Sequence, residues 1–456
     1  MTRARAPPFC GLQPLQKEKP LPVIQGSGGA TALVGMPGFV VGAHQLVDGE
    51  LWLFVETTAD VVGCSECGTR AVGHGRARTL VRDLSVSGRP TVLCWRKRRW
   101  RCPEPDCDTK TWSERTPEIR PRAVLTERAR IRLAEMVNVG GDSIAAAAAT
   151  FGVGWHCANQ AVADFTDPHI DDDDRLEGVE AIGVDEKRFL NATPTSRTVY
   201  TTQIVDLDRH LVLDVVEGRS RDVLDRWLRQ RGTEWCDRIR LATLDPAAGY
   251  RNALTEHLPR ATLVVDHFHA IRLANQAIDD VRRRVQQETL GHRGRKGDPL
   301  YRARRVLLTA DERLTEDRLS WMASLLAVGD PDGEVGAAWV AKELLREVFS
   351  AVDERHARRR MIAFYVFCAD ADIPELGRLA RTVSRWSDLI FAFHRTAGAS
   401  NGRTENAHML IEKTRRNAHG FRNIDNYRRR LIGRHGIKWH TQPTARIRGR
   451  QPQSIA

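Results

Sequence analysis

The sequence predicts a multidomain protein of the α+β and α/β classes, and three observations lead to this prediction. Two cysteine pairs lie in a strand-rich N-terminal region, two short helices follow, and from Gly178 onward strands alternate with helices. Alternation of this kind predicts a sheet covered by helices. A chain of 456 residues is long enough for two or three domains, each with its own core.

Four cysteines form two short pairs in the N-terminal region. Cys64-x2-Cys67 and Cys102-x4-Cys107 are separated by 34 residues, and strand-like sequence lies between them. Each pair can offer two thiolates to one tetrahedral Zn²⁺, and Gly68 supplies the backbone freedom that a tight turn needs. We therefore predict a zinc ribbon, with His74 as the substitute ligand if one cysteine is not used. Four thiolates leave no open position for water, so the zinc is expected to be structural.

Two helices separated by a short turn follow the cysteine region. Helical patterns cover 144–150 and 155–165, and Gly152 and Gly154 mark the turn between them. This length and spacing are typical of a helix-turn-helix that binds DNA. The second helix carries His156, Asn159 and Gln160, which suit base or phosphate contacts. An ordinary helical hairpin fits the same pattern. After it, residues 167–174 contain Pro168 and read as a hydrophilic linker.

The region after residue 178 has the element order of an RNase H-like core. Strands are predicted at 181–185, 198–206, 210–216, 239–244 and 262–265. Helices are predicted at 222–230, 250–257 and from Phe268 onward. The resulting order of strand, strand, strand, helix, strand, helix, strand, helix is that of an RNase H-like mixed sheet. Residues 285–395 are mostly helical and predict an insertion that interrupts this core.

Three carboxylates form the candidate active site. Asp185 ends the first core strand and Asp245 ends the fourth, and these strands are neighbours in such a sheet. Glu405 lies in the first turn of a helix that Ser400 or Asn401 can cap. Three carboxylates can hold two Mg²⁺ or Mn²⁺ ions, which prefer oxygen ligands. Such ions support an in-line phosphoryl displacement on DNA.

Each of these carboxylates also has a structural interpretation. Aspartates are common at strand ends, and a glutamate in a first helical turn favours the helix dipole. His269, after the fifth strand, is a candidate for handling the phosphate or the leaving group, whereas His267 is expected to pack locally. The rival carboxylates are Glu186 for the first position, Asp206 or Asp266 for the second, and Glu412 for the third.

The positive charge of the chain is concentrated in two places. The net charge is +12, and residues 413–450 contain twelve Lys or Arg against one acid. Localised basic sequence suits a polyanion such as DNA, although a solvated basic face is the alternative. The predicted DNA contacts from these two regions are Arg96, Lys97, Arg98, Arg99, Arg415, Arg416, Arg422 and Arg428.

Membrane and secretory classes find no support in the sequence. No apolar run approaches the roughly 20 residues of a membrane span. The N-terminus lacks the apolar core of a secretory signal. We therefore expect a cytoplasmic protein that associates with the nucleoid.

The motifs quoted above resemble those of the ISL-three-type insertion-sequence transposases, bacterial DDE enzymes with an N-terminal zinc ribbon and helix-turn-helix. The resemblance covers nearly everything from about residue 39 to about 450. Its most specific stretches are Trp95-Arg-Lys-Arg-Arg-Trp-Arg-Cys102, Gly183-Val-Asp185-Glu186, Val265-Asp-His-Phe-His269, Ser400-Asn-Gly402 with Glu405, and Gly420-Phe-Arg-Asn-Ile-Asp-Asn-Tyr-Arg428.

The resemblance implies DDE roles for Asp185, Asp245 and Glu405, and zinc binding by Cys64, Cys67, Cys102 and Cys107. It also implies binding to terminal inverted repeats, DNA cutting and joining, and at least a dimer that brings two ends together. The sequence departs from the family at Arg403, where proline is usual, and around 406–408. The alternatives are an inactive or domesticated DNA-binding protein and, less well supported, a nuclease or resolvase with the same core.

These interpretations divide the chain into seven segments. We expect a disordered leader over 1–35, because it is rich in Pro, Gly and Ala without periodicity. The later segments are a zinc-ribbon domain (36–118), a helix-turn-helix region (119–166), the first part of the catalytic core (175–284), a helical insertion (285–395), the last core helix with its closing segment (396–435) and a basic tail (436–456).

Overall fold

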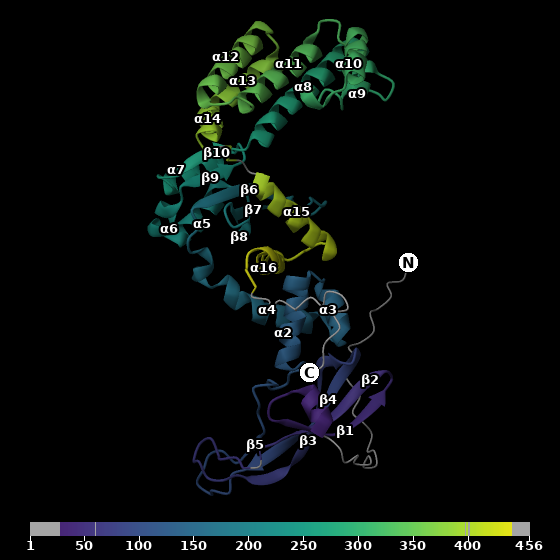
Figure 1. The fold of residues 1–456 in the computed structure, drawn as a ribbon, viewed down its shortest axis with the longest axis vertical. Helices are drawn as coiled ribbons and strands as arrows, with labels where there is room; N and C mark the ends of the chain where they lie inside the picture. Colours follow the sequence, from purple (N-terminus) through teal and green to yellow (C-terminus); the bar gives the residue numbers. More distant parts are fainter. Residues whose placement is uncertain (1–27, 60, 397, 400–401, 440–456) are drawn as a thin grey trace, which may run out of the picture. The chain divides into compact units, whose positions relative to one another are not determined.

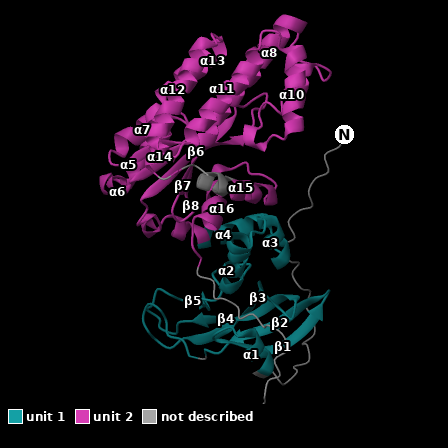
Figure 2. Ribbon diagram, turned by 45° about the horizontal axis from the view of Figure 1, so that its top comes forward, with its two compact units in different colours: residues 1–165 teal, residues 166–456 magenta. Residues whose placement is uncertain are grey.

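The computed structural model describes residues 28–59, 61–396, 398–399 and 402–439, with the backbone only at 28 and 402–408. The chain divides into two compact units, Met1–Phe165 and Thr166–Ala456 (Figure 2). Each unit has its own buried core, and each is described separately below. None of the described helices is long and apolar enough to cross a membrane.

Unit 1 begins with a twisted sheet of five strands. They are β1 (Phe39–Val47), β2 (Glu50–Thr57), β3 (Val72–Val86), β4 (Arg89–Arg101) and β5 (Thr111–Ser113), in the order β1-β2-β4-β3 with β5 on β4. Two-residue turns join β1 to β2 and β3 to β4. Positive φ angles at Asp48, Gly49, Ser87 and Gly88 suit the right-handed twist of such hairpins. Alternate residues such as Val55 and Leu93 form the core.

A short helix precedes this sheet, which corrects one prediction. Helix α1 (Gly28–Val34) lies within the segment that the sequence predicts to be a disordered leader. Val34 is buried and packs with Phe39 and Val41, so burial of apolar side chains stabilises the helix despite its weak periodicity. The prediction of disorder is therefore wrong for residues 28–34. Residues 1–27 lie outside the described part of the chain.

A small helical cluster follows the sheet in unit 1. Helix α2 (Glu127–Glu135) continues into a π-helical turn (Met136–Gly140), and α3 (Ile144–Phe151) and α4 (Trp155–Ile170) follow. Thr126 caps α2 and Ser143 caps α3, each by accepting a hydrogen bond from a backbone N–H. Gly152 ends α3 in the left-handed conformation, with a φ of 61°. The cluster buries Leu133, Val137, Ile144, Phe151 and Val162.

The linker predicted at 167–174 is wrong for its first half, because α4 continues to Ile170 with Pro168 inside it. A proline removes one backbone hydrogen bond, and only the last residues of the helix follow it. A 3₁₀ helix (Asp173–Leu176) then leads into the sheet of unit 2.

Unit 2 is built on a second mixed sheet. Its strands are β6 (Ala181–Leu190), β7 (Val199–Asp206), β8 (Leu211–Glu217), β9 (Leu241–Leu244) and β10 (Thr262–Val265), in the order β10-β9-β6-β7-β8. β9 is parallel to both β6 and β10, whereas β6, β7 and β8 pair antiparallel. Helices α5 (Arg221–Arg231), α6 (Thr233–Arg238) and α7 (Ala248–His257) pack against the core that contains Ile182 and Ile204.

Two C-terminal helices pack against other residues of the same sheet. They are α15 (Gly402–Asn417) and α16 (Ile424–His435). Phe189, Val212 and Val215 form a buried cluster with Ile411 of α15 and Tyr427 of α16. The sheet is therefore covered on both faces, which fits its largely apolar strands.

The rest of unit 2 is helical. The long helix α8 (His267–Leu290) extends from the sheet toward α9 (Pro299–Ala303) and α10 (Glu316–Gly329) (Figure 1). Helices α11 (Glu334–Phe349), α12 (Glu354–Asp370), α13 (Pro374–Arg385) and α14 (Ser387–Arg395) complete the bundle. The boundary predicted between residues 284 and 285 falls inside α8.

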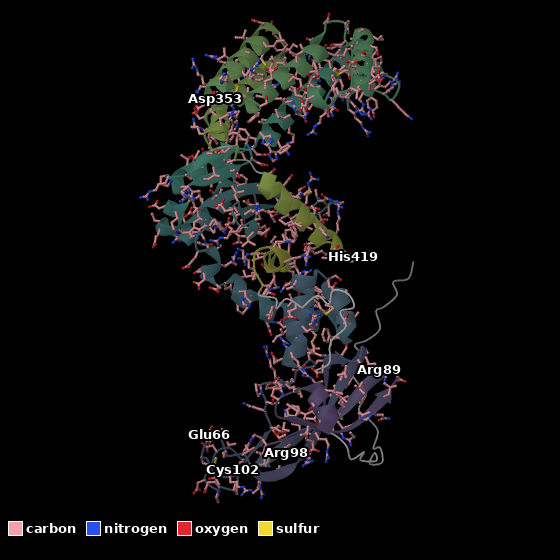
Figure 3. All side chains as sticks on the ribbon, viewed as in Figure 1. Glu66, Arg89, Arg98, Cys102, Asp353 and His419 are labelled. Atoms are coloured by element: carbon pink, nitrogen blue, oxygen red, sulfur yellow. The ribbon has the colours of Figure 1, made fainter. Side chains whose placement is uncertain are left out.

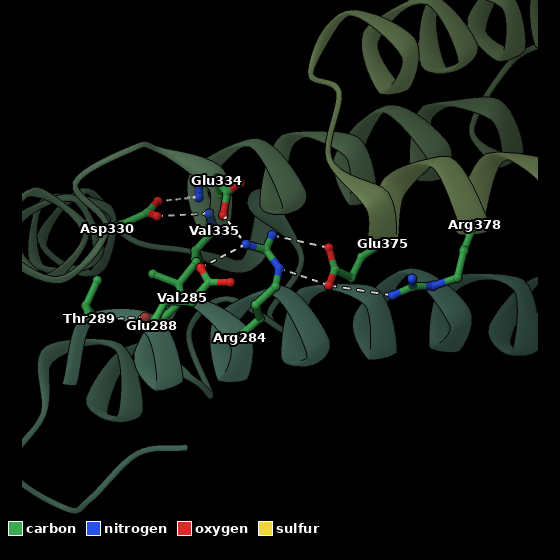
Figure 4. A network of polar contacts seen from close by, with 10 residues as sticks. Arg284, Val285, Glu288, Thr289, Asp330, Glu334, Val335, Glu375 and Arg378 are labelled. Carbon is green, nitrogen blue, oxygen red and sulfur yellow. Dashed lines mark hydrogen bonds and ion pairs between the residues drawn. The ribbon is translucent and has the colours of Figure 1, made fainter. Parts of the chain in front are cut away.

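A polar network joins three helices of this bundle. Arg284 on α8 pairs with Glu375 on α13 at 3.1 Å and with Glu334 on α11 at 2.8 Å (Figure 4). Asp330 accepts hydrogen bonds from the backbone N–H of Val335 and Gly336 and so satisfies the first turn of α11. These contacts fix the relative positions of α8, α11 and α13.

Candidate functional site

Two aspartates converge at one edge of the sheet in unit 2. β6 and β9 are parallel neighbours with Val184 opposite Leu244, so Asp185 and Asp245 follow at equivalent positions. One carboxylate oxygen from each and a ring nitrogen of His269 all lie within 4.8 Å of one another. Asp185 is 5% exposed and Asp245 is 6% exposed. The two predicted aspartates therefore lie close together, and both are largely buried.

His269 links this pair to a third carboxylate. Its Nδ1 lies 2.7 Å from Oδ1 of Asp245 and 3.0 Å from Oδ2 of Asp266. Asp266 is fully buried and directly precedes α8, so it and His269 are three residues apart at the start of one helix. In the sequence, Asp266 is a rival to Asp245 for the second carboxylate position. The structure places it instead beside His269, and their spacing of three was the available signal.

Electrostatics favour a bound proton or cation at this site. Burial raises the pKa of Asp245 to about 7, the charge of Asp185 adds to this rise, and the hydrogen bond to His269 opposes it. Burial also disfavours a charged His269, but its hydrogen bonds to Asp245 and Asp266 prevail and raise its pKa to about 10. The imidazolium therefore carries the proton in this cluster. Asp185 and Asp245 offer adjacent carboxylate oxygens, which are the ligands that a hard divalent ion prefers.

The third predicted carboxylate is placed only by its backbone. Glu405 lies in the first turn of α15, and its side chain falls outside the described residues. Its rival Glu412 is engaged elsewhere, because its carboxylate lies 3.5 Å from Nζ of Lys187 and 3.8 Å from Nη1 of Arg415. Ser400 and Asn401, the predicted caps, also lie outside the described residues.

Two other rivals have separate structural contacts. Glu186 pairs with Arg219 at 3.2 Å. Asp206 lies opposite Ile182 at the start of β6, and accepts backbone hydrogen bonds from the turn between β7 and β8. Asp206 is therefore at the other end of the sheet from Asp185 and does not join the cluster.

The four paired cysteines of unit 1 form a second cluster. One sulfur from each of Cys64, Cys67, Cys102 and Cys107 lies within 4.8 Å of all the others. Sγ of Cys64 is 3.6 Å from that of Cys107, and Sγ of Cys67 is 3.5 Å from that of Cys102. Glu66 and Cys102 lie close together at one end of unit 1 (Figure 3). Four sulfurs at such spacing suit tetrahedral Zn²⁺.

The backbone of the first pair has the form of a knuckle. The N–H of Gly68 donates to the carbonyl of Cys64 at 2.9 Å, and Gly68 has a φ of 71°. This left-handed conformation is one that glycine adopts without strain. Hydrogen bonds with Thr69 lower the pKa of Cys67 to about 6, whereas burial raises the pKa of Cys102 and of Cys107, so without a metal the thiolate form is favoured at Cys67 and disfavoured at the other two. His74 is exposed and is not among the clustered ligands.

The first basic run lies on β4. Arg96 pairs with Glu56 at 2.8 Å, and the ammonium of Lys97 lies 4.9 Å from the ring centre of Trp95. Arg98 donates to the carbonyl of Ala59. Arg99 is exposed. Three of the four basic side chains in this run therefore already make contacts within unit 1.

The predicted DNA contacts on α4 are at least partly accessible. His156 and Gln160 are exposed, and Asn159 is half-buried. The ring of His156 packs edge-on against Trp155, and the Gln160 amide donates to Asp164 at 2.6 Å.

Two arginines of the C-terminal basic region that are predicted DNA contacts make contacts within unit 2. Arg428 donates to the buried carboxylate of Asp214 at 2.6 Å. Arg415 donates to the carbonyls of Arg188 and Phe189, at 3.0 and 2.6 Å. A buried carboxylate and the carbonyls at a strand end both need donors, and these guanidinium groups supply them.

The other two predicted arginines of this region, Arg416 and Arg422, are exposed. The predicted basic tail over 436–456 is described only as far as Trp439.

Two protein-family models match parts of this chain. A family model described as "Transposase" matches residues 182–431, which is more than half of the chain. A second model, described as "zinc-finger of transposase IS204/IS1001/IS1096/IS1165", matches residues 60–107 and thus all four clustered cysteines. The matched regions carry the paired aspartates and the sulfur cluster, respectively. The protein is a transposase with a zinc-ribbon domain suited to structural zinc.

The chain belongs to the ISL-three-type transposase family. It is 24% identical over 378 residues to the transposase for insertion sequence element IS1001 of Bordetella parapertussis, and this match covers 82% of the chain and 88% of the relative. It is also 28% identical over 281 residues to the transposase for insertion sequence element IS1557 of Mycobacterium tuberculosis, which covers 55% of the chain and 58% of that relative.

Proposed function

We propose that this protein is a DDE transposase of a bacterial insertion sequence, which binds terminal inverted repeats and catalyses metal-dependent DNA cleavage and strand transfer. The observation that carries the proposal is the meeting of Asp185 and Asp245 at the carboxyl edge of two parallel strands. The order β10-β9-β6-β7-β8 supports assignment of the sheet as an RNase H-like core. Glu405 would join them from α15.

The donor set fits a divalent cation. Asp185 and Asp245 are buried with adjacent oxygens, and their mutual repulsion is relieved by a positive charge. Bound Mg²⁺ or Mn²⁺ would activate the attacking oxygen and stabilise the leaving oxygen of a phosphoryl displacement. Asp185, Asp245 and Glu405 would hold the ions.

His269 has a supporting role in this proposal. Its ring is fixed between Asp245 and Asp266, at 2.7 and 3.0 Å. The hydrogen bond to Asp245 orients that carboxylate, and the buried Asp266 keeps the ring in place. The proton on the ring is also in position to neutralise charge next to the reacting phosphate.

The N-terminal unit would supply recognition of the element ends. We assign the zinc ribbon to 36–118 and a helix-turn-helix region to 119–166, where α4 would present His156, Asn159 and Gln160 to DNA. The exposed Arg99, Arg416 and Arg422 are the basic residues best placed to contact phosphates. Two ends must be joined in one complex, so the active form would be at least a dimer that acts at the nucleoid.

The test uses full-length protein and a DNA that carries the element's own ends. With Mg²⁺ or Mn²⁺, the wild type should cleave the ends and join them to a target. Asp185→Asn, Asp245→Asn and Glu405→Gln should each lose at least 100-fold in cleavage rate, which is roughly 3 kcal/mol of barrier. The variants should still bind the ends, which separates loss of chemistry from loss of folding.

Glu412→Gln is the matched control for the third position. Because Glu412 pairs with Lys187, this variant should cut at a rate close to that of the wild type. If Glu412→Gln is inactive and Glu405→Gln is active, the third carboxylate is misassigned. If the wild type binds the ends but never cuts them, the domesticated DNA-binding alternative replaces the proposal.

A further inference from the structure

A basic hollow opens in unit 2 between α7 and the junction of α13 and α14. It has a volume of about 830 Å³, and Pro246, the residue after Asp245, forms part of its wall. The other walls come from α7 and from the junction of α13 and α14, which lie side by side (Figures 1 and 2). No sequence motif pointed to it, because its arginines are far apart in the chain.

The charge of the hollow is positive. Three arginines line it, Arg221, Arg251 and Arg385, against one acid, Glu256. Arg221 is already neutralised, since it pairs with Glu256 and lies 3.4 Å from Asp225. Among the described residues, no carboxylate pairs with Arg251 or Arg385. The hollow therefore holds two positive charges for which the described part of the chain supplies no partner.

One of these arginines is held rigidly. Nη1 of Arg251 donates to the backbone carbonyl of Arg385 at 2.8 Å, and its guanidinium lies 5.5 Å from the ring centre of Trp386. Trp386 is itself buried. A guanidinium fixed by one nitrogen and a ring keeps its other donors for a ligand, so little side-chain entropy would be lost on binding.

From these observations we infer that the hollow binds the phosphodiester backbone of the DNA strand that continues from the scissile phosphate. This inference rests on the proposed function, and it adds the path of the strand beyond the metal site. Arginine donors match phosphate oxygens, and Asn252 and Thr255 in the same hollow can donate to sugar or phosphate oxygens. The position beside Pro246 places the bound phosphates next to Asp245.

The test compares full-length wild type with Arg385→Gln, with the double variant Arg251→Gln/Arg385→Gln, and with Arg359→Gln as the control. Arg359 is an exposed arginine on α12 that does not line the hollow. The affinity for a duplex carrying the element's end is measured by fluorescence anisotropy between 50 mM and 300 mM salt. Cleavage of the same duplex is measured in Mg²⁺.

Each lost phosphate contact should reduce the slope of log affinity against log salt by about 0.9, or about fivefold in affinity near 0.15 M salt. We expect about fivefold weaker binding for Arg385→Gln and about 30-fold for the double variant, with KM rising in parallel and kcat within about twofold of wild type. Arg359→Gln should match the wild type.

The two possible failures are distinguishable. If the wild type cuts the DNA and the hollow variants bind with its affinity and its salt slope, the inference about the hollow is overturned and the proposed function stands. If the wild type neither binds nor cuts, the proposed function fails. Arg385→Gln keeps the backbone carbonyl that holds Arg251, so it tests the inference even if the double variant folds poorly.

Discussion

Arg428 offers a direct test of whether the C-terminal basic region binds DNA or stabilises the fold. The sequence predicts a DNA contact, whereas the structure pairs Arg428 with Asp214 through Nε at 2.6 Å and Nη2 at 3.3 Å. The perturbation is Arg428→Met, which keeps the length of the side chain and removes its charge. Asp214 would then remain buried with hydrogen bonds only from Trp227, at 3.0 Å, and from its neighbour's backbone N–H.

The expected loss of unfolding free energy follows from the burial of Arg428 and Asp214. Removing one member of a buried ion pair costs about 3–5 kcal/mol. The Asp214 side chain is 9% exposed but that of Arg428 is 36% exposed, so solvent screens part of the interaction. The remaining hydrogen bonds to Asp214 reduce the loss further. We therefore expect about 2–3 kcal/mol, which is a decrease of roughly 1 M in the urea midpoint if the m-value is about 3 kcal/mol/M.

The pH dependence of this loss has a definite sign. Burial raises the pKa of Asp214, but the hydrogen bonds and charge of Arg428 outweigh it and hold the pKa below its usual value. A carboxylate with a depressed pKa stabilises the fold above its unfolded pKa of about 3.9 and loses that contribution as the pH falls through the folded pKa. In Arg428→Met the effect of burial on Asp214 is no longer opposed by the guanidinium and favours the protonated carboxyl, so the difference between wild type and variant should be largest at neutral pH and should shrink as the pH falls.

The assay is urea unfolding of the full-length, zinc-saturated protein, followed by tryptophan fluorescence. Trp227 reports on the site directly because its indole N–H donates to Asp214. Arg416→Met is the control, because Arg416 is exposed and should change stability by less than about 0.5 kcal/mol. If Arg428→Met unfolds like the wild type but binds DNA more weakly, the structural role assigned here is refuted.

Three further predictions concern other parts of the chain. Cys102→Ser should lose bound zinc and about 10 kcal/mol of metal-linked folding energy in the ribbon, measured by metal content and circular dichroism, whereas Cys157→Ser on α4 should keep its zinc. Arg284→Met should lower the unfolding free energy by about 2–3 kcal/mol in urea titrations, because it leaves the mostly buried Glu375 without its main partner; equal stability would contradict the network in Figure 4. Burial lowers the pKa of His435 to about 4, so protonation opposes folding as the pH falls below about 6.5. Between pH 7.5 and pH 5, His435→Gln should therefore gain about 2 kcal/mol relative to wild type.

The parts of the fold with strong local patterns were predictable. The strand at Thr262–Val265 was predicted to the residue, and β7, β8 and β9 within two residues, because apolar runs bounded by polar turns define them, whereas β6 continues five residues beyond its predicted end at Asp185. The convergence of Asp185 and Asp245 followed from strand order alone. The four cysteines were found because metal ligands occur in short, recognisable spacings.

The features that the sequence did not indicate come from interactions between distant residues. Arg428 and Asp214 are 214 positions apart, and no local pattern shows that a buried carboxylate will need that guanidinium. Helix α1 forms because Val34 finds a core built by later strands. The basic hollow combines α7 with a helix junction more than 120 residues later in the chain. Tertiary contacts of this kind override composition and local charge.

Several basic residues of the C-terminal region make contacts within unit 2. Arg429 pairs with Asp167 at 2.6 Å, Arg428 pairs with Asp214, and Arg415 holds the end of β6. Arg415 and Arg428 hold α15 and α16 against the sheet, whereas Asp167 lies on α4, and α15 is the helix that carries Glu405. Basic residues in this region therefore hold α15, the helix on whose backbone the proposed third carboxylate residue lies, against the rest of unit 2. The positive charge that remains for DNA is smaller than the sequence suggests, which makes the hollow beside Asp245 the more important place to look for phosphate contacts.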